Sequence, residues 1–349
     1  MASWQAGLLQ AALRWMVKRK AHLPIDPVET RRSVRGRRLS RKLLSRITGF
    51  HAGAVSGDRV APAPWLTPST GLGVLYLHGG GYFFCSAQTH RPMTLGLATQ
   101  LQAPVWAPDY RLAPEAPYPA ALDDALATYH HLLDAEPARQ WVLAGDSAGG
   151  GLCLALAGRI RSLGLRTPLA LVLYSPWTDL TCSGASLVTN DRSCSIFSAQ
   201  SVRFAASLYP GSTAPGHPEI SPLFADLTGL PPMLVFAADE EALLDDSTRL
   251  VERARASGVE VRYERVSGVP HAWPVFQRIL PEGREAMRIT GEFVARQFQA
   301  KQAIASPGGA AAAAPACLHD LVPGPLAGPV GVRHTVTASA WSAGSRRLP

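Results

Sequence analysis

Cysteine is scarce in this sequence. Five cysteines occur in 349 residues, an odd number, and no two of them are spaced as C-x-x-C. This excludes the usual patterns of a zinc site and of a disulfide framework, so we expect no metal and a reducing, cytoplasmic location. An uninterrupted apolar run of about 18 residues is also missing, so no transmembrane helix is indicated. The positive cluster near the N-terminus follows an apolar stretch instead of preceding it, which is not the order of a secretory signal.

Excess basic charge is absent from most of the chain. The formal net charge is +8, but residues 1–46 contain twelve Lys and Arg against Asp26 and Glu29, so the remaining 303 residues sum to about −2. Residues 18–46, which hold all but one of these Lys and Arg, also lack interleaved Phe, Trp or Tyr. We therefore expect no nucleic-acid partner.

Residues 3–20, "SWQAGLLQAALRWMVKRK", predict an amphipathic helix within this basic segment. The apolar stripe consists of Trp4, Leu8, Leu9, Ala12, Trp15 and Met16. Such a stripe can dock on its own domain or on another surface. Peripheral membrane contact through residues 1–46 therefore stays open.

From about residue 55 the sequence alternates short apolar runs with helical patterns. Runs at 73–77, 104–107, 141–144, 169–174 and 233–237 have the length and continuous hydrophobicity of strands buried on both faces, and 259–266 is a last strand-like segment. Segments 118–135 and 148–163 have helical patterns. The alternation predicts an α/β fold with a mostly parallel sheet covered on both sides, and functional groups at the carboxyl ends of its strands.

Two segments depart from this rhythm. Residues 183–220 are rich in Ser, Thr, Pro and Gly around one apolar helical patch, which is typical of an insertion that forms a lid. Residues 301–349 are dominated by Pro, Gly and Ala without sustained periodicity, so we expect a disordered tail.

The most informative stretch is "VLAGDSAGG". A strand runs into Gly145, Asp146, Ser147, Ala148 and Gly149 and then into a helix, which is the setting that the G-x-S-x-G pattern requires. Glycines are needed because the turn is too tight for side chains beside the serine. Ser147 is therefore a candidate nucleophile, exposed at a helix N-terminus that favours negative charge.

The stretch "YLHGGGYFF" supplies a second element. His78 ends a strand and is followed by Gly79, Gly80 and Gly81, a costly run unless the backbone must approach something closely. The N–H groups of Gly79 and Gly80, with that of Ala148, could bind the oxyanion of a tetrahedral intermediate.

A serine hydroxyl needs a base, and His271 in "SGVPHAW" is the candidate. It follows the last strand-like segment and sits on a loop. The other histidines considered are weaker candidates: His130 and His131 in a helix, His90 in a loop, and His319 and His334 in the tail.

Residues 60–298 resemble the hormone-sensitive lipase-like family of α/β-hydrolases, in particular its bacterial GDSAG-type esterases. The matching stretches are "YLHGGGYFF", "DYRLAPEAPYPAALDDA", "GDSAGGG", "SPWTDL", "SPLFADLTGLPPMLV" and "GVPHAW". The resemblance implies a serine carboxylesterase that needs no cofactor, with Ser147 and His271 in the order that this fold uses. It also implies a helical cap built from residues 1–55 and 183–220 on a catalytic domain spanning 56–300.

The family pattern selects the third catalytic residue from "DEEALLDD". Many members place a carboxylate, then another four positions on, with the histidine about thirty residues after the first. Glu241 fits, with Asp245 four positions later and His271 thirty residues later. Asp239 and Glu240 remain alternatives, because Asp is the commoner residue in the family. Asp245 and Asp246 are expected in the first turn or at the N-cap of the next helix.

Substrate identity is less defined. Phe83, Phe84, Cys85 and Trp177 are expected to shape an apolar pocket for small-molecule esters with short or medium acyl chains. Lactone hydrolysis and deacetylation of small metabolites are alternatives within the fold, and a non-catalytic binding module is an alternative of another class. The sequence indicates no oligomeric state.

Overall fold

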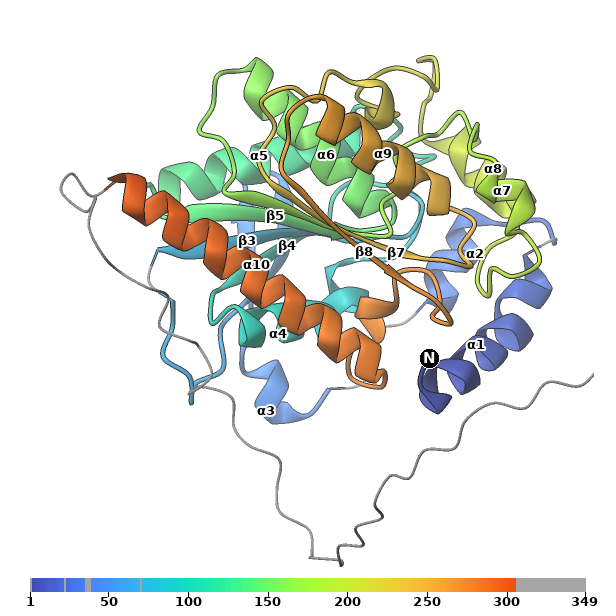
Figure 1. The fold of residues 1–349 in the computed structure, drawn as a ribbon, viewed down its shortest axis with the longest axis horizontal. Helices are drawn as coiled ribbons and strands as arrows, with labels where there is room; N and C mark the ends of the chain where they lie inside the picture. The colour runs from blue at the N-terminus through green and yellow to red at the C-terminus, as the bar shows by residue number, and fades with distance from the viewer. Residues whose placement is uncertain (1, 22, 35–38, 70, 306–349) are drawn as a thin grey trace, which may run out of the picture. The chain divides into compact units, whose positions relative to one another are not determined.

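An eight-stranded sheet forms the centre of the computed structural model, which describes residues 2–21, 23–34, 39–69 and 71–305 (Figure 1). The strand order is β1-β2-β4-β3-β5-β6-β7-β8. The β1–β2 and β2–β4 pairs are antiparallel, and the other pairs are parallel. The strands are β1 Ile47–Ala52, β2 Val55–Val60, β3 Leu72–Leu77, β4 Val105–Pro108, β5 Gln140–Asp146, β6 Ala170–Tyr174, β7 Met233–Ala238 and β8 Val261–Val266.

Helices cover both faces of the sheet. Figure 1 shows α5 (Ala120–Ala135), α6 (Ala148–Ser162) and α9 (Leu244–Ala256) above it, and α4 (Ala87–Gln100) and α10 (Pro281–Ala305) below it. The other helical elements are α1 Trp4–Met16, η1 Lys18–Lys20, α2 Pro27–Ser33, α3 Arg41–Leu44, α7 Ser186–Thr189, α8 Ala199–Leu208, η2 Pro222–Phe224 and η3 Trp273–Phe276. The predicted α/β architecture is confirmed.

Strands β3, β4, β6 and β7 are buried at every position because both faces of the sheet are covered. In β5, Leu143 packs in one hydrophobic cluster, while its neighbours Val142 and Ala144 pack in the cluster on the opposite face. The six predicted strands correspond to β3 to β8. These six strands are parallel to one another, so their carboxyl ends lie at the same edge of the sheet.

The expected domain limits need correction at both ends. Residues 47–52 were expected in a helical segment that ends at 55, but they form strand β1, which pairs with β2. Because several β1 side chains are exposed, its sequence contains no continuous apolar run. At the other end, α10 continues to Ala305, so the first five residues of the expected tail are helical. The remainder of that expected tail, 306–349, lies outside the described residues.

Helix α1 packs through a different face from the one expected. Its buried residues are Ala6, Gln10 and Leu13, whereas Trp4 and Trp15 of the predicted stripe are exposed. Small Ala6 allows the helix backbone to approach the domain closely, and the large apolar side chains face outward. Within the described residues, no helix is both long and apolar enough to cross a bilayer.

The N-terminal segment contacts the insertion between β6 and β7. Arg14 donates to the carbonyl of Ser193 at 3.0 Å, and Ser198 Oγ donates to the carbonyl of Ala21 at 2.9 Å. Lys18 forms an ion pair with Asp191 at 3.2 Å. These contacts join the two segments that were expected to share a cap.

Candidate active site

Ser147 occupies a sharp turn between β5 and α6. Its backbone has φ 52° and ψ −123°, a positive φ that is uncommon for a residue with a side chain. The turn is fixed by two hydrogen bonds at 2.9 Å, from Ser147 N–H to the carbonyl of Tyr174 and from Trp177 N–H to the carbonyl of Ser147. Ser147 therefore stands at the carboxyl end of a central strand and at the N-terminus of a helix, where negative charge is favoured.

Glycine is required beside Ser147 because two backbones meet there. A Cβ atom on Gly149 would lie 2.0 Å from the carbonyl oxygen of Leu77, and one on Gly145 would lie 2.5 Å from that of Gly149. The end of β3 thus touches the first turn of α6, and the three-glycine loop that follows β3 lies beside Ser147.

The N–H of Gly79, an expected oxyanion donor, is already engaged. It donates to Asp146 Oδ1 at 3.0 Å, and a Cβ atom on Gly79 would lie 2.2 Å from Asp146 Oδ2. The structure therefore corrects this expectation. In the part of the chain described, the N–H groups of Gly80 and Gly81 have no recorded acceptor, and both residues have positive φ values, of 111° and 57°.

Asp146 is the centre of a buried polar network. Its Oδ1 also accepts a hydrogen bond from the Tyr76 hydroxyl at 2.5 Å and lies 3.4 Å from Nε2 of His90. Burial alone would raise the pKa of Asp146, but the His90 charge and these hydrogen bonds lower it to about 2. Burial likewise opposes the charged form of His90, but Asp146 raises the pKa of His90 above its ordinary value. The two groups form a pair inside the protein that is an ion pair when His90 is protonated.

His78, at the start of the glycine loop, is held as a neutral side chain. Burial and the charge of His90 lower the pKa of His78 to about 3. Its ring stacks on Tyr110 with the centroids 4.2 Å apart, and the Tyr110 hydroxyl donates to the His78 carbonyl at 2.6 Å. Tyr110 therefore supports the glycine loop.

Glu241 and His271 meet at the ends of β7 and β8. Nδ1 of His271 lies 2.5 Å from Oε2 of Glu241, and both side chains are buried. The N–H of Ala238 donates to the other carboxylate oxygen at 3.1 Å. Among the described residues, His271 Nε2 has no hydrogen-bond partner.

The His271 loop is joined to the loop that holds Ser147. The N–H of Ala272 donates to Ser175 Oγ at 3.1 Å, and Ser175 follows Tyr174, whose carbonyl accepts from Ser147 N–H. Adjacent parallel strands thus bring Ser147 and His271 to one sheet edge from positions far apart in the chain.

The alternative acids have other partners. Asp239 pairs with Arg265 at 2.8 Å and accepts from Ser267 Oγ, while the Glu240 carboxylate accepts from Gly268 N–H at 2.9 Å. Of the three candidates, Glu241 is the one that contacts His271.

Asp245 and Asp246 lie in the first turn of α9, as predicted, but Asp246 does more than interact with the helix dipole. Its Oδ1 accepts from the N–H groups of Thr178 and Asp179 at 2.7 and 2.8 Å. Burial and the charge of Asp179 raise the pKa of Asp246 to about 7, although those backbone hydrogen bonds oppose the shift. Asp246 therefore stabilises the "SPWTDL" loop, which begins at Ser175.

The residues expected to line a pocket lie around the glycine loop. Phe83 is buried and packs edge-on against Phe204 of α8 at a centroid distance of 6.2 Å, and Phe84 is half-buried beside it. Trp177 is buried, with its indole N–H donating to the carbonyl of Asp179 at 3.2 Å. Helix α8 of the insertion therefore covers the loop.

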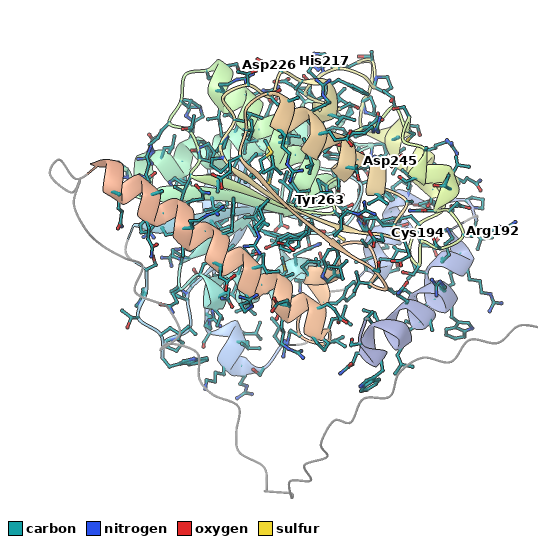
Figure 2. The ribbon with its side chains drawn as sticks, viewed as in Figure 1. Arg192, Cys194, His217, Asp226, Asp245 and Tyr263 are labelled. Carbon is teal, nitrogen blue, oxygen red and sulfur yellow. The ribbon has the colours of Figure 1, made fainter. Side chains whose placement is uncertain are left out.

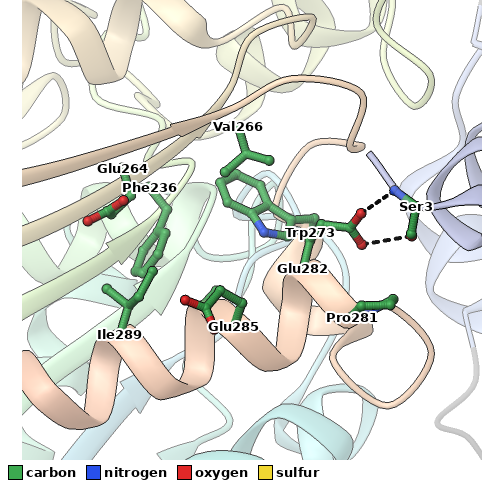
Figure 3. A pocket seen from close by; sticks show the side chains of 10 residues that line it. Ser3, Phe236, Glu264, Val266, Trp273, Pro281, Glu282, Glu285 and Ile289 are labelled. Atoms are coloured by element: carbon green, nitrogen blue, oxygen red, sulfur yellow. Dashed lines mark hydrogen bonds between the residues drawn. The ribbon is translucent and has the colours of Figure 1, made fainter. Parts of the chain in front are cut away.

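A cavity of about 430 Å³ is lined by residues of β7, β8, η3 and α10 (Figure 3). Phe236, Trp273 and Ile289 form part of its apolar wall, and Ser3 closes one end by donating to Glu282 Oε1 at 2.5 Å. None of the predicted catalytic residues lines it. It is separate from the surroundings of Ser147.

Sequence reasoning missed three groups that support the site. His90 was assigned to a loop but lies in the first turns of α4, where it pairs with Asp146. Asn190 donates to the carbonyls of Asp239 and Glu241, and Phe197 packs edge-on against His271 with the centroids 5.0 Å apart. These contacts join segments far apart in the chain and leave no local pattern.

Comparison with known proteins gives one consistent result. Residues 74–275 match a family model described as "alpha/beta hydrolase fold". An acetyl-hydrolase of Streptomyces hygroscopicus is 41% identical over 235 residues, which cover 66% of this chain and 79% of the relative. An esterase of Acinetobacter venetianus is 36% identical over 222 residues, covering 63% and 73% of the two chains.

Solved structures with the same fold cover more of the chain. A crystal structure of EstE5 soaked with p-nitrophenyl butyrate has a TM-score of 0.79 and 34% identity, and covers 85% of this chain and all of its own. An esterase from the bacterial hormone-sensitive lipase family has a TM-score of 0.76 and 36% identity, and covers 85% and 99% of the two chains.

Proposed function

This chain is a carboxylesterase-type hydrolase of the α/β-hydrolase family, in its hormone-sensitive lipase-like group, and we propose that it hydrolyses esters of short acyl chains. The proposed catalytic residues are Ser147, His271 and Glu241. The observation that carries the proposal is the 2.5 Å contact between His271 Nδ1 and Glu241. This contact fixes the imidazole so that Nε2 is available to the nucleophile.

In the proposed reaction, Ser147 Oγ attacks the ester carbonyl while Nε2 of His271 takes its proton. The imidazolium then gives that proton to the leaving alcohol, and an acyl-enzyme remains. Water attacks the acyl-enzyme by the same steps and releases the carboxylic acid. The Glu241 carboxylate holds the tautomer of His271 and stabilises the cation that forms on its ring.

The oxyanion that forms at the carbonyl carbon is assigned to three backbone donors. These are the N–H groups of Gly80, Gly81 and Ala148. We assign this role to Gly81 and not to Gly79, because the Gly79 N–H donates to Asp146. Each well-placed donor of this kind contributes about 100-fold or more to the rate.

A short acyl chain is supported by the packing of α8 on the glycine loop. A methyl group on Gly81 would lie 3.1 Å from the Phe83 ring and 3.4 Å from the Cβ of Ala205. This leaves little room for a long acyl chain beside the proposed oxyanion donors. The name of the Streptomyces relative, acetyl-hydrolase, favours acetyl esters as the first substrates to test.

The test is a panel of p-nitrophenyl esters from acetate to decanoate, with γ-butyrolactone as a cyclic ester. We expect the largest kcat/KM for acetate or butyrate and a loss of about a million-fold in kcat for Ser147→Ala. A preference for decanoate, or for the lactone, would reject the short-acyl assignment. Equal slow hydrolysis by wild type and Ser147→Ala would instead support a non-catalytic binding module.

A further inference from the structure

Helix α1 exposes an apolar stripe on the face opposite its packed face. Trp4, Leu8 and Trp15 are 71%, 62% and 69% exposed, and Met16 beside them is 51% exposed. In an α-helix these first three residues lie within about 40° of one another around the axis. The packed face of Ala6, Gln10 and Leu13 is on the other side. We call Trp4, Leu8, Trp15 and Met16 the α1 stripe.

Basic residues surround the C-terminal end of the α1 stripe, and residues 2–25 contain no Asp or Glu. Arg19 and Lys20 are exposed. Arg192 is also exposed and lies in the loop that contacts α1, at the outer edge of the molecule in Figure 2. Lys18 is already paired with Asp191, so it is not counted among these free charges.

An apolar helix face with two tryptophans and a basic border suits the surface of an anionic membrane. Tryptophan is favoured at the level of lipid headgroups, and a helix of this kind lies in the plane of the interface with its apolar face toward the acyl chains. Each nearby basic residue adds attraction to anionic lipid. A second copy of the chain fits less well, because residues 2–25 contain no Asp or Glu that could pair with the basic border in a two-fold contact through α1.

We propose that α1 docks this protein on anionic lipid surfaces through the α1 stripe, with Arg19, Lys20 and Arg192 facing the headgroups. This docking goes beyond the proposed reaction and does not depend on it. Its consequence is that esters dissolved in a membrane are presented to the face of the cap that carries α1.

The full chain is tested by co-sedimentation with two kinds of vesicle, phosphatidylcholine alone and an equimolar mixture with phosphatidylglycerol. We expect binding to the mixed vesicles at low salt and release near 0.5 M NaCl, where the Debye length is only about 4 Å. The double variant Trp4→Ala/Trp15→Ala should lose binding at least tenfold. Trp65→Ala is the matched control, since Trp65 is 61% exposed outside the stripe.

A charge variant tests the docking without changing any packed side chain. Arg19→Gln/Lys20→Gln should weaken binding to mixed vesicles by about fivefold per charge, while turnover of p-nitrophenyl acetate stays at the wild-type value. Three results would each overturn the proposal: no binding of wild type at low salt, equal binding to both vesicles, or a dimer in light scattering that Trp4→Ala/Trp15→Ala converts to monomer.

A second inference comes from the side chain of Asn190. Its amide Nδ2 donates to the carbonyl oxygens of Asp239 and Glu241, each at 3.0 Å. Ser193 Oγ donates to the carbonyl between them, that of Glu240, at 3.2 Å. Three consecutive carbonyls of the acid loop are thus bound by one short segment of the insertion.

The same segment reaches the base and the N-terminal segment. Phe197 packs against the ring of His271. The ammonium of Lys18 donates to the carbonyls of Asp191, at 2.5 Å, and of Phe197. The insertion therefore holds both members of the acid–base pair and is itself held by residues before α2.

We infer that Asn190 is a positioning residue that fixes Glu241 for its contact with His271, an inference that rests on the proposed catalytic function. Asn190→Ala should lower kcat about tenfold or more with little change in KM, because it disturbs the acid and not the ester site. Asn190→Asp replaces the donor by an acceptor facing two carbonyls and should be worse.

A merely structural role is distinguished by the pH profile of kcat/KM. In Asn190→Ala the acidic limb should move in the same direction as in Glu241→Gln, and Thr189→Ala, an exposed neighbour, should leave it in place. An unshifted profile with normal kcat in Asn190→Ala would overturn the inference. Should Glu241→Gln itself be fully active, the catalytic assignment fails, and that result is separate from failure at Asn190.

Discussion

On the β3 side of Ser147, Asp146 binds Tyr76, Gly79 and His90, which all belong to the sheet or to the elements directly joined to it. On the β7 side, Glu241 and His271 are contacted by Asn190 and Phe197 of the insertion. The oxyanion side is thus fixed from within the core, by an ion pair. The proposed acid–base side is held from outside the core, by Asn190 and Phe197 of the insertion.

This difference separates two kinds of sensitivity. Changes in the core network should act mainly on stability, because they leave a buried charge without its partner. Changes in the acid loop should act mainly on turnover, because Glu241, the proposed acid, lies in that loop and contacts the proposed base His271.

The largest expected effect is on the acid–base side. Glu241→Gln should reduce kcat about 10⁴-fold, because the amide cannot stabilise the imidazolium or select its tautomer. Asp239→Asn is the matched control and should stay near wild type, since Asp239 is bound to Arg265. Steady-state kinetics with p-nitrophenyl butyrate check both, and the reverse pattern would reassign the acid.

On the oxyanion side, His90→Leu should lower the free energy of unfolding by about 3 kcal/mol, because Asp146 is left buried and unpaired. The raised pKa of His90 means that its pairing stabilises fully below about pH 6.5 and is lost as pH rises through the native value. Urea titrations at pH 6 and pH 9 should therefore give a larger difference between wild type and variant at pH 6. The control, His130→Leu on the exposed side of α5, should show no such dependence.

A smaller effect is expected at Asp246. With its pKa raised to about 7, the native protein binds this proton more tightly than the unfolded chain does. Asp246 therefore removes stability as pH rises from about 4 to 7. Asp246→Asn keeps an oxygen acceptor for Thr178 and Asp179 and should flatten this decline in a thermal-unfolding series. An unchanged pH dependence would contradict the buried, proton-binding state of Asp246.

The smallest effect is expected from truncation. All proposed catalytic residues lie before Ala305, so removal of 306–349 should leave kcat within about twofold of wild type. A chain ending at residue 292 is the contrasting variant. It lacks Phe293 and Val294, which are buried in α10, and should lose folded protein in circular dichroism.

The sequence predicted the parts of the fold that have strong local patterns. Strands β3 to β7 each contain a continuous apolar run, and the glycines around Ser147 mark a close backbone approach. The edge strand β1 and its neighbour β2 alternate weakly and were missed, as was the outward orientation of Trp4 and Trp15. A periodic stripe indicates a helix but does not say which face the domain covers.

Local pattern was also insufficient inside the site. The glycine run indicated a loop with free N–H donors. The fold, however, brings Asp146 Oδ1 to 3.0 Å from the Gly79 N–H, so Gly79 is no longer a candidate oxyanion donor. The ion pair of His90 and Asp146 joins residues 56 positions apart by way of the sheet. Such contacts depend on tertiary packing, which no short motif records.

The central claim is that Ser147 is the nucleophile, activated by His271. The most direct measurement is the intact mass of the protein after reaction with diethyl p-nitrophenyl phosphate, followed by peptide mapping. The account predicts one diethylphosphoryl group, on Ser147, formed rapidly in wild type and Asp239→Asn and absent in Ser147→Ala. An adduct on another residue, or one that persists in Ser147→Ala, would contradict it.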